Sequence, residues 1–285
     1  MMSDPIVVGA DASAGADRAV RWAAEEAAAR GRRLHIVHSI DKRLYELPLL
    51  APRRAADTVA AAGEEILDAA RRRARAHRPG IEVSTELVAE HPATALRGQS
   101  RHAFELVVGH RGLSGFAGLT LGSIGLRMAS HALGPVVIVR GEATSPYGEI
   151  VVGLDLVADP AVPLKYAFEA AAAREARVRV LHAWRPVGDL ADVRDPVEVK
   201  AVEEKLRWQI IEAHARWRKA HPSVEVTEEV LSAHPVAALT DASRAADLVV
   251  VGAHDHNWLD LPRLGSVSHG VIHHSHCPVA IARSR

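Results

Sequence analysis

Short apolar runs alternate along the chain with longer stretches rich in alanine. The apolar runs of the N-terminal half are mostly Val, Ile and Leu, and they predict strands at 5–10, 34–39, 81–88, 105–109 and 136–140. The longer stretches repeat apolar residues at the period of a helix, which predicts helices at 17–30, 57–77, 93–102 and 123–131. This alternation is typical of a parallel sheet with crossover helices, so the pattern predicts an α/β fold.

The C-terminal half repeats this pattern in register. The run Ile-Val-Val-Gly-Ala-Asp at 6–11 returns as Ile-Val-Val-Gly-Leu-Asp at 150–155, and the glycines of later loops, Gly109 and Gly122, return as Gly252 and Gly265. Turn-forming residues at 141–147 interrupt the periodicity between the copies. The chain is therefore predicted to contain two tandem domains, at 1–143 and 148–285.

Composition narrows the class of protein. Apolar residues make up 48% and charged residues 25%, which is the balance of a globular protein with a sizeable core. Lys plus Arg equals Asp plus Glu at 35 each, so no basic field favours nucleic acid or a membrane as a partner. The single cysteine, Cys277, forms no intrachain disulfide, and no targeting or membrane-spanning segment is recognised. We therefore expect a cytoplasmic protein.

The most informative stretch is Val107-Val108-Gly109-His110-Arg111-Gly112, followed after nine residues by Gly122-Ser123. The stretch ends a predicted strand, and glycines there let the backbone turn sharply and approach a ligand closely. Gly122-Ser123 opens a predicted helix, whose free N–H groups and positive dipole end attract anions. Ser123 can donate a further hydrogen bond and Arg111 can add charge. The combination predicts a phosphate site.

Asp11 ends the first predicted strand, and we expect it beside this phosphate site. Ligands of open parallel sheets bind beyond the carboxyl ends of the strands, where the strand order reverses. If the first and fourth strands are neighbours, Asp11 faces the loop after Gly109 and lies near a ribose or a base. The alternative is structural, since Asp is common in turns and caps, and glycines between a strand and a helix are common turn residues.

Several features of the N-terminal copy resemble the universal stress protein family. They are the glycine spacing, Asp11 at the end of the first strand, His38-Ser39 at the end of the second strand, and the closing Gly-Pro-Val-Val-Ile-Val-Arg. The resemblance runs from residue 5 to the end of the chain. It implies two doubly wound, Rossmann-like domains, each with a parallel sheet of five strands. Family members pair through their last strands, which implies an intrachain pseudo-dimer with 136–140 beside 278–282, and leaves a homodimer open.

Many members of that family bind ATP, so the resemblance also implies a set of binding residues. In the N-terminal copy the end of the first strand would contact adenosine, the backbone of Ser39 would meet the adenine, and the glycine loop would surround the ribose and phosphates. The implied residues are Ala10, Asp11, Ser39, Val108, Gly109, Arg111, Gly112, Gly122, Ser123 and Ile124. The corresponding residues of the C-terminal copy are Leu154, Asp155, Ala183, Gly252, His254, Gly265, Ser266 and Val267.

The C-terminal copy departs from the family pattern in its glycine loop. The loop reads Gly252-Ala253-His254-Asp255, so that Asp255 stands where the N-terminal copy has Gly112. A carboxylate next to a phosphate repels it by about 1 kcal/mol at about 4 Å even in water. We therefore predict weaker or no nucleotide binding in this copy, unless a cation bridges Asp255 to the phosphate.

These features favour a nucleotide-binding stress or regulatory module over an enzyme. The expected ligand is ATP, or ADP or AMP, with or without Mg²⁺, and the expected partner is an unidentified regulated protein. No lysine follows the loop as in a Walker motif, and no catalytic triad signature is recognised. The alternative is an enzyme that hydrolyses ATP slowly or transfers adenylyl groups. A flavin or dinucleotide binder is disfavoured, because the first strand is followed by no Gly-x-Gly-x-x-Gly.

The seventeen histidines do not predict a metal site. The C-terminal copy groups six of them, but no carboxylate or cysteine set completes a coordination pattern. The six are His254, His256, His269, His273, His274 and His276. We predict no metal ligands and no catalytic residues. Cys277, just before the last strand, is expected to be a small core residue.

Overall fold

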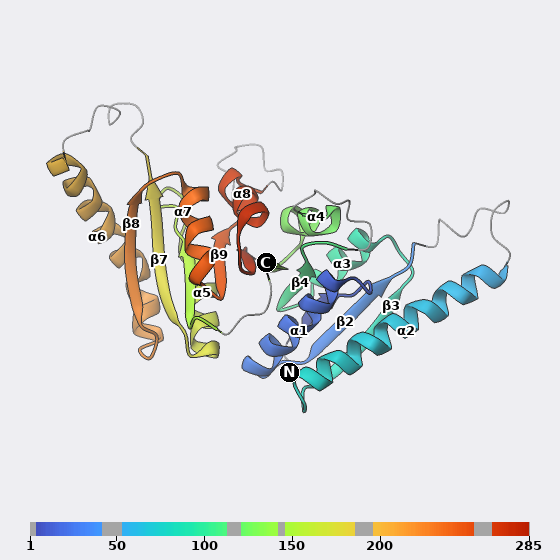
Figure 1. The fold of residues 1–285 in the computed structure, drawn as a ribbon. Helices are drawn as coiled ribbons and strands as arrows, with labels where there is room; N and C mark the ends of the chain where they lie inside the picture. Colours follow the sequence, from blue (N-terminus) through green and yellow to red (C-terminus); the bar gives the residue numbers. More distant parts are fainter. Residues whose placement is uncertain are drawn as a thin grey trace. The chain divides into compact units, whose positions relative to one another are not determined.

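The computed structural model describes residues 4–41, 53–112, 121–141, 146–185, 196–253 and 264–284. The chain forms two compact units, Met1–Glu142 and Ala143–Ser284 (Figure 1). They are called the N-terminal unit and the C-terminal unit below. Within the described ranges, no helix is both long and apolar enough to cross a membrane.

The N-terminal unit alternates strands and helices along its whole length, as the apolar pattern predicts. Its elements are β1 (Ile6–Gly9), α1 (Ala14–Ala29), β2 (Leu34–Ser39), α2 (Arg53–His77), β3 (Val83–Val88), α3 (Pro92–Ser100), β4 (Glu105–Gly109), α4 (Ser123–His131) and β5 (Val136–Val139). The strands lie in the order β3-β2-β1-β4-β5, and each neighbouring pair is parallel. The predicted α/β fold with a five-stranded parallel sheet is confirmed.

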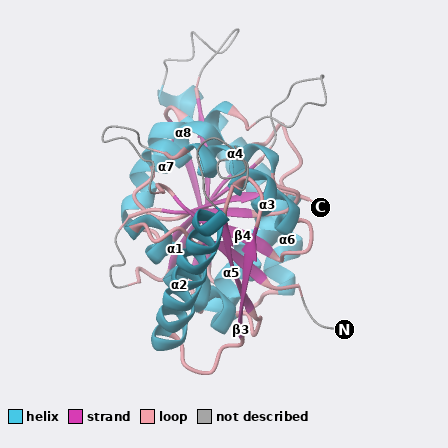
Figure 2. Ribbon diagram, turned by 90° about the vertical axis from the view of Figure 1, so that its right-hand side faces the viewer, coloured by secondary structure: helices cyan, strands magenta, loops and turns pink. Residues whose placement is uncertain are grey.

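Helices cover both faces of this sheet. Helices α1 and α2 pack against one another and lie side by side in Figure 1, while α3 packs against α4. Figure 2 shows the strands flanked by helices. The chain steps from β1 to β2 to β3 in one direction and then crosses β1 to form β4. The strand order therefore reverses between β1 and β4, as in a doubly wound sheet.

The C-terminal unit repeats this architecture. Its elements are β6 (Glu149–Gly153), α5 (Ala161–Arg174), β7 (Arg177–Trp184), α6 (Pro196–Ala220), β8 (Val226–Ser232), α7 (Pro235–Ala242), a short 3₁₀ helix η3 (Ser243–Ala245), β9 (Leu248–Gly252), α8 (Ser266–His274) and β10 (Val279–Ala282). Its strands lie in the order β8-β7-β6-β9-β10, and each pair of neighbours is parallel. The sheet reverses between β6 and β9, which are the counterparts of β1 and β4.

The central strands form the core of each unit. Ile6, Val8 and Val107 of the N-terminal unit are fully buried, as are Val152 and Val250 of the C-terminal unit. Strands buried on both faces read as continuous apolar runs, which is why the sequence pattern located them. Cys277 is buried, which confirms its predicted place in the core.

Several boundaries differ from the predicted ones by one to four residues, and two of these differences have local explanations. Helix α1 begins at Ala14 and not at residue 17, because the side chain of Ser13 accepts a hydrogen bond from Ala16 N (3.1 Å) and caps the helix. Strand β3 begins at Val83, since Gly80 adopts a positive φ of 94° in the preceding turn.

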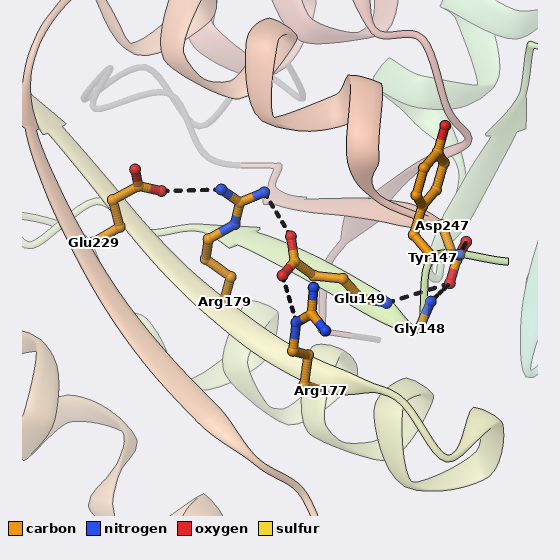
Figure 3. A network of polar contacts seen from close by, with 7 residues as sticks. All are labelled: Tyr147, Gly148, Glu149, Arg177, Arg179, Glu229 and Asp247. Atoms are coloured by element: carbon orange, nitrogen blue, oxygen red, sulfur yellow. Dashed lines mark hydrogen bonds and ion pairs between the residues drawn. The ribbon is translucent and has the colours of Figure 1, made fainter.

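An acidic side chain holds the start of the C-terminal unit at the edge opposite the strand tips. The carboxylate of Asp247 accepts hydrogen bonds from three successive backbone amides, those of Tyr147 (2.7 Å), Gly148 (2.8 Å) and Glu149 (3.3 Å). Figure 3 shows this group beside the first residues of β6. Asp247 thereby anchors the segment that enters the unit.

The Glu149 side chain extends this network in the other direction. It is almost buried and pairs with two arginines of β7, Arg177 (2.7 Å) and Arg179 (2.5 Å). Arg179 also contacts Glu229 of β8 at 3.3 Å (Figure 3). Three neighbouring strands are thus joined by alternating charges, which compensates the burial of the Glu149 carboxylate.

Candidate functional site

The carboxyl ends of β1 and β4 form the centre of the candidate site in the N-terminal unit. The two strands are paired directly, with Ile6 opposite Glu105 and Val8 opposite Val107. The predicted residues follow these strands, end β2 or open α4, so they belong to one edge of the sheet. They are Ala10, Asp11, Ser39, Val108, Gly109, Arg111, Gly112, Gly122, Ser123 and Ile124.

The start of α4 lies close to the first residues of the loop that follows β4. The amide of Gly122 donates to the carbonyl oxygen of His110 at 2.7 Å. A Cβ on Gly122 would lie 3.7 Å from the backbone nitrogen of Gly112, so the two glycines of the predicted phosphate loop lie close together. Gly122 caps α4 and offers no side-chain acceptor to the amides of the first turn. The start of α4 therefore has the features of an anion-binding helix end.

Asp11 faces this loop and also shapes the turn after β1. One carboxylate oxygen, Oδ1, accepts a hydrogen bond from Ser13 N at 3.0 Å. The other, Oδ2, would lie 2.5 Å from a Cβ placed on Gly112. Asp11 therefore takes the turn role that the sequence left open. It also lies beside the predicted phosphate loop, as expected.

The first turn of α1 packs directly on the loop, which the sequence did not indicate. A Cβ on Gly109 would lie 2.6 Å from the carbonyl carbon and oxygen of Gly15, and a Cβ on Gly15 would overlap the carbonyl oxygen of Arg111. The absence of a side chain at Gly109 thus allows two backbone segments to come into contact. Its close approach to a ligand stays a prediction.

A histidine ties the ends of β1 and β2 together. The Nδ1 of His38 donates to the carbonyl oxygen of Ala10 at 2.7 Å, and Ala10 N donates to Val37 O at 2.9 Å. The next residue, Ser39, donates its hydroxyl to the carbonyl of Glu90. The tie recurs in the C-terminal unit, where His182 Nδ1 lies 2.8 Å from Leu154 O. The recurrence of His38 as His182 was the available sequence signal for this role.

His110 is neutral at pH 7 in this environment. Its pKa is lowered to about 4, first by burial and then by the positive charges of Arg18, Arg140 and Arg111, against an opposing effect of the Val139 carbonyl. The lowered pKa means that the imidazole supplies no positive charge at neutral pH. The positive charge at this edge comes from the arginines, of which Arg111 is exposed.

The predicted residues of the C-terminal unit lie at the corresponding edge, except His254, which is outside the described ranges. Leu154 and Asp155 follow β6, Ala183 lies in β7, Gly252 ends β9, and Gly265, Ser266 and Val267 open α8. His254 and Asp255 lie outside the described residues, so the predicted effect of Asp255 stays a prediction. Asp155 Oδ1 accepts from Val157 N at 2.9 Å, as Asp11 does from Ser13.

The histidines of the C-terminal unit form no recognisable metal site in the part of the chain that the structure describes. No group of three His, Cys, Asp or Glu side chains there is placed to hold a metal ion. The rings of His269 and His273 lie 4.7 Å apart on α8. His254 and His256 lie outside the described residues.

Comparison with known proteins gives matches over the full length of the chain. The model of the universal stress protein family matches residues 2–140 and again residues 146–283. A universal stress protein of Mycolicibacterium smegmatis is 32% identical over 290 residues, which cover 98% of this chain and 97% of that protein. One of Mycobacterium tuberculosis strain H37Rv is 29% identical and covers 98% and 94%.

The fold is also found in a solved structure. The crystal structure of a universal stress protein from Archaeoglobus fulgidus aligns with a TM-score of 0.72 over 99% of both chains, at 18% sequence identity. At this identity the likeness concerns the fold alone.

Proposed function

Because the chain belongs to the universal stress protein family, we propose that its N-terminal unit binds an adenine nucleotide and that the protein acts as a nucleotide-binding stress or regulatory module. The ligand is ATP, or ADP or AMP, with or without Mg²⁺. The binding residues are those gathered at the carboxyl edge of β1, β2 and β4 and at the start of α4. The nucleotide acts as a ligand that biases conformation or the choice of a protein partner.

One observation carries this proposal. The hydrogen bond from Gly122 N to His110 O (2.7 Å) brings the start of α4, which has no side-chain cap, beside Gly112, and Gly112 in turn faces Asp11. Backbone amides at a helix start favour phosphate oxygens, and a carboxylate at the end of the neighbouring strand suits a ribose hydroxyl. One nucleotide is long enough to contact both.

The same features favour a binding module over an enzyme. Hydrolysis or adenylyl transfer requires carboxylates that hold Mg²⁺ at the phosphates, and Asp11 is the one acidic residue among the predicted binding residues of the N-terminal unit. Its Oδ1 already accepts a hydrogen bond from Ser13 N. A cytoplasmic location, where adenine nucleotides are abundant, and the pairing of the two domains as a pseudo-dimer are further parts of this proposal.

Nucleotide extraction and titration test the proposal. We expect denatured, purified protein to release an adenine nucleotide, identified by mass spectrometry, and the emptied protein to bind ATP with one tight site per chain in calorimetry. Gly112→Asp places a second carboxylate against Asp11 and the phosphates, and about a hundredfold loss of ATP affinity is expected from repulsion in a partly buried site.

Two variants control this experiment. Gly98→Asp introduces the same residue at an exposed position of α3, where a Cβ meets no described atom within 4 Å, and it should leave ATP affinity unchanged. Gly112→Ala adds bulk without charge and should have a smaller effect than Gly112→Asp. Unchanged affinity in Gly112→Asp, or no binding by the wild type, would contradict the proposal. Turnover of ATP with Mg²⁺ above background, lost in Gly112→Asp, would favour the enzyme.

A further inference from the structure

Two backbone segments far apart in sequence touch at the candidate site. Gly15, in the first turn of α1, and Gly109, at the end of β4, each lie where a Cβ would overlap the other segment. Ser13 adds a polar contact, because its hydroxyl donates to the carbonyl oxygen of Arg111 at 3.3 Å while accepting from Ala16 N at 3.1 Å. We call the contact of Ser13 and Gly15 with residues 109–111 the loop clamp.

The C-terminal unit shows that the fold forms without the loop clamp. Val157 stands in place of Ser13 and has no hydroxyl, and Asp159 stands in place of Gly15. Helix α5 begins only at Ala161, after Pro160. A Cβ on Gly252, the counterpart of Gly109, would meet no atom of the described residues within 4 Å. A five-stranded unit of this architecture therefore does not need the contact for its sheet.

The loop clamp fixes the direction of one backbone amide. The carbonyl of Arg111 points to α1, where Ser13 holds it and Gly15 leaves room for it. In a trans peptide group the N–H lies opposite the C=O, so the N–H of Gly112 points away from α1. A Cβ on Gly122 would lie 3.7 Å from this nitrogen, which places the start of α4 beside it.

We propose that Ser13 and Gly15 are positioning residues that hold the Gly112 amide in the orientation needed for the phosphates of the nucleotide. The inference rests on the proposed function and deepens it. Preorganised amides bind an anion more tightly because no ordering of the loop is needed on binding. The loop clamp acts on the phosphate end of the ligand and not on the adenosine end, so it makes the site selective for a nucleotide over the nucleoside.

Calorimetry of the full chain with ATP and with adenosine tests this inference. Gly15→Ala forces the Arg111 carbonyl to move, and the dissociation constant for ATP is expected to rise about tenfold or more, while that for adenosine changes less than about twofold. Ser13→Ala removes the hydroxyl and should raise the constant for ATP about threefold. Ser13→Thr keeps a hydroxyl and should restore wild-type affinity. Gly98→Ala, on exposed α3, is the matched glycine control.

Each outcome has a distinct meaning. Unchanged ATP affinity in Ser13→Ala and Gly15→Ala, with a wild type that binds ATP, overturns the inference and leaves the proposed function standing. Parallel losses for ATP and adenosine also overturn it, since a purely structural role predicts them. If Gly15→Ala does not fold, as judged by thermal unfolding, the comparison of Ser13→Ala with Ser13→Thr decides. A wild type that binds neither ligand refutes the proposed function, and the inference falls with it.

Discussion

The loop between the first strand and the first helix differs between the two units more than any other described part of the candidate site. In the N-terminal unit four residues, 10–13, join β1 to α1. In the C-terminal unit seven residues, 154–160, join β6 to α5. The first turn of α1 reaches the end of β4. The longer loop contains Asp159 and Pro160, and among the described residues no equivalent contact is made with the end of β9.

The difference shows that glycines at equivalent strand ends can have different structural roles. Gly109 and Gly252 occupy the same place in the repeat and both end a strand. A Cβ on Gly109 would overlap the backbone of Gly15, whereas a Cβ on Gly252 would meet none of the residues that the structure describes within 4 Å. The sequence alone shows the same residue at both places, and only the contacting segment distinguishes them.

The largest effect is expected from substitution of the two glycines, Gly109 and Gly252. Gly109→Ala drives a Cβ into the Gly15 backbone and should destabilise the N-terminal unit by about 1–3 kcal/mol, as overpacking does. Gly252→Ala should change the C-terminal unit by less than about 0.5 kcal/mol. Hydrogen exchange followed by mass spectrometry measures each unit separately. Equal effects in the two units would show that the loop difference is not what distinguishes these glycines.

A second test addresses the opposite edge, where the C-terminal unit has Asp247 and the N-terminal unit has Phe104, over which the guanidinium groups of Arg30 and Arg32 stack. Asp247→Ala leaves the amides of Tyr147, Gly148 and Glu149 without their carboxylate, and a loss of about 1–2 kcal/mol in the C-terminal unit is expected. Exchange should speed up at residues 147–149 first. The control Asp247→Asn keeps an acceptor and should lose less.

A third test measures the stability of the N-terminal unit as a function of pH. His110 of this unit can titrate, whereas the equivalent residue of the C-terminal unit is Ala253. The pKa of His110 is lowered to about 4 in the folded unit, from the ordinary histidine value of 6.5. Between these values the unfolded chain binds the proton and the folded unit does not, so stability contributed by the neutral imidazole is lost as pH falls from 6.5 to about 4. His110→Ala should flatten this dependence in the N-terminal unit, measured by hydrogen exchange corrected for the intrinsic pH effect.

Binding of a nucleotide should shift the pKa of His110 upward. A bound phosphate favours the protonated imidazole, so saturation with ATP should raise the His110 pKa, as followed by its ring protons in nuclear magnetic resonance. A His110 pKa that ATP leaves unchanged would argue against an anion at this loop.

The smallest expected effect concerns the thiol of the C-terminal unit. Cys277 is buried, and burial raises its pKa to about 12, so labelling with a maleimide should be slow until that unit opens. The labelling rate should be the same in the wild type and in Gly109→Ala, because the substitution lies in the other unit. A faster rate would mean that opening of one unit is transmitted to the other.

Much of the fold could be predicted from the sequence, because it depends on local patterns. The strands at 34–39 and 105–109 and the helix at 123–131 agree with β2, β4 and α4 residue by residue. Helices α3 and α7 begin at Pro92 and Pro235, as expected of a residue without an N–H. Continuous apolar strands and proline-started helices can be read without knowing what lies nearby.

The candidate site could be predicted only in part, because its details depend on contacts between distant residues. The glycines and Asp11 were found from their spacing. The roles of Ser13 and Gly15 were not, since they are defined by Arg111 and Gly109, nearly a hundred residues further along the chain. The departure from the N-terminal pattern at Val157 and Asp159 was visible in the repeat, and it could have drawn attention to this loop.

The histidine tie holds the ends of the first two strands of each unit in place independently of the loops that follow. His38 and His182 hold equivalent carbonyl oxygens at 2.7 and 2.8 Å, although the loops that follow differ in length and composition. The strand tips therefore keep their place when the loop beyond them changes. Exchange of residues 12–16 for 156–160 should consequently transfer ligand preference between the units without rebuilding either sheet, which makes this edge suitable for grafting new recognition loops.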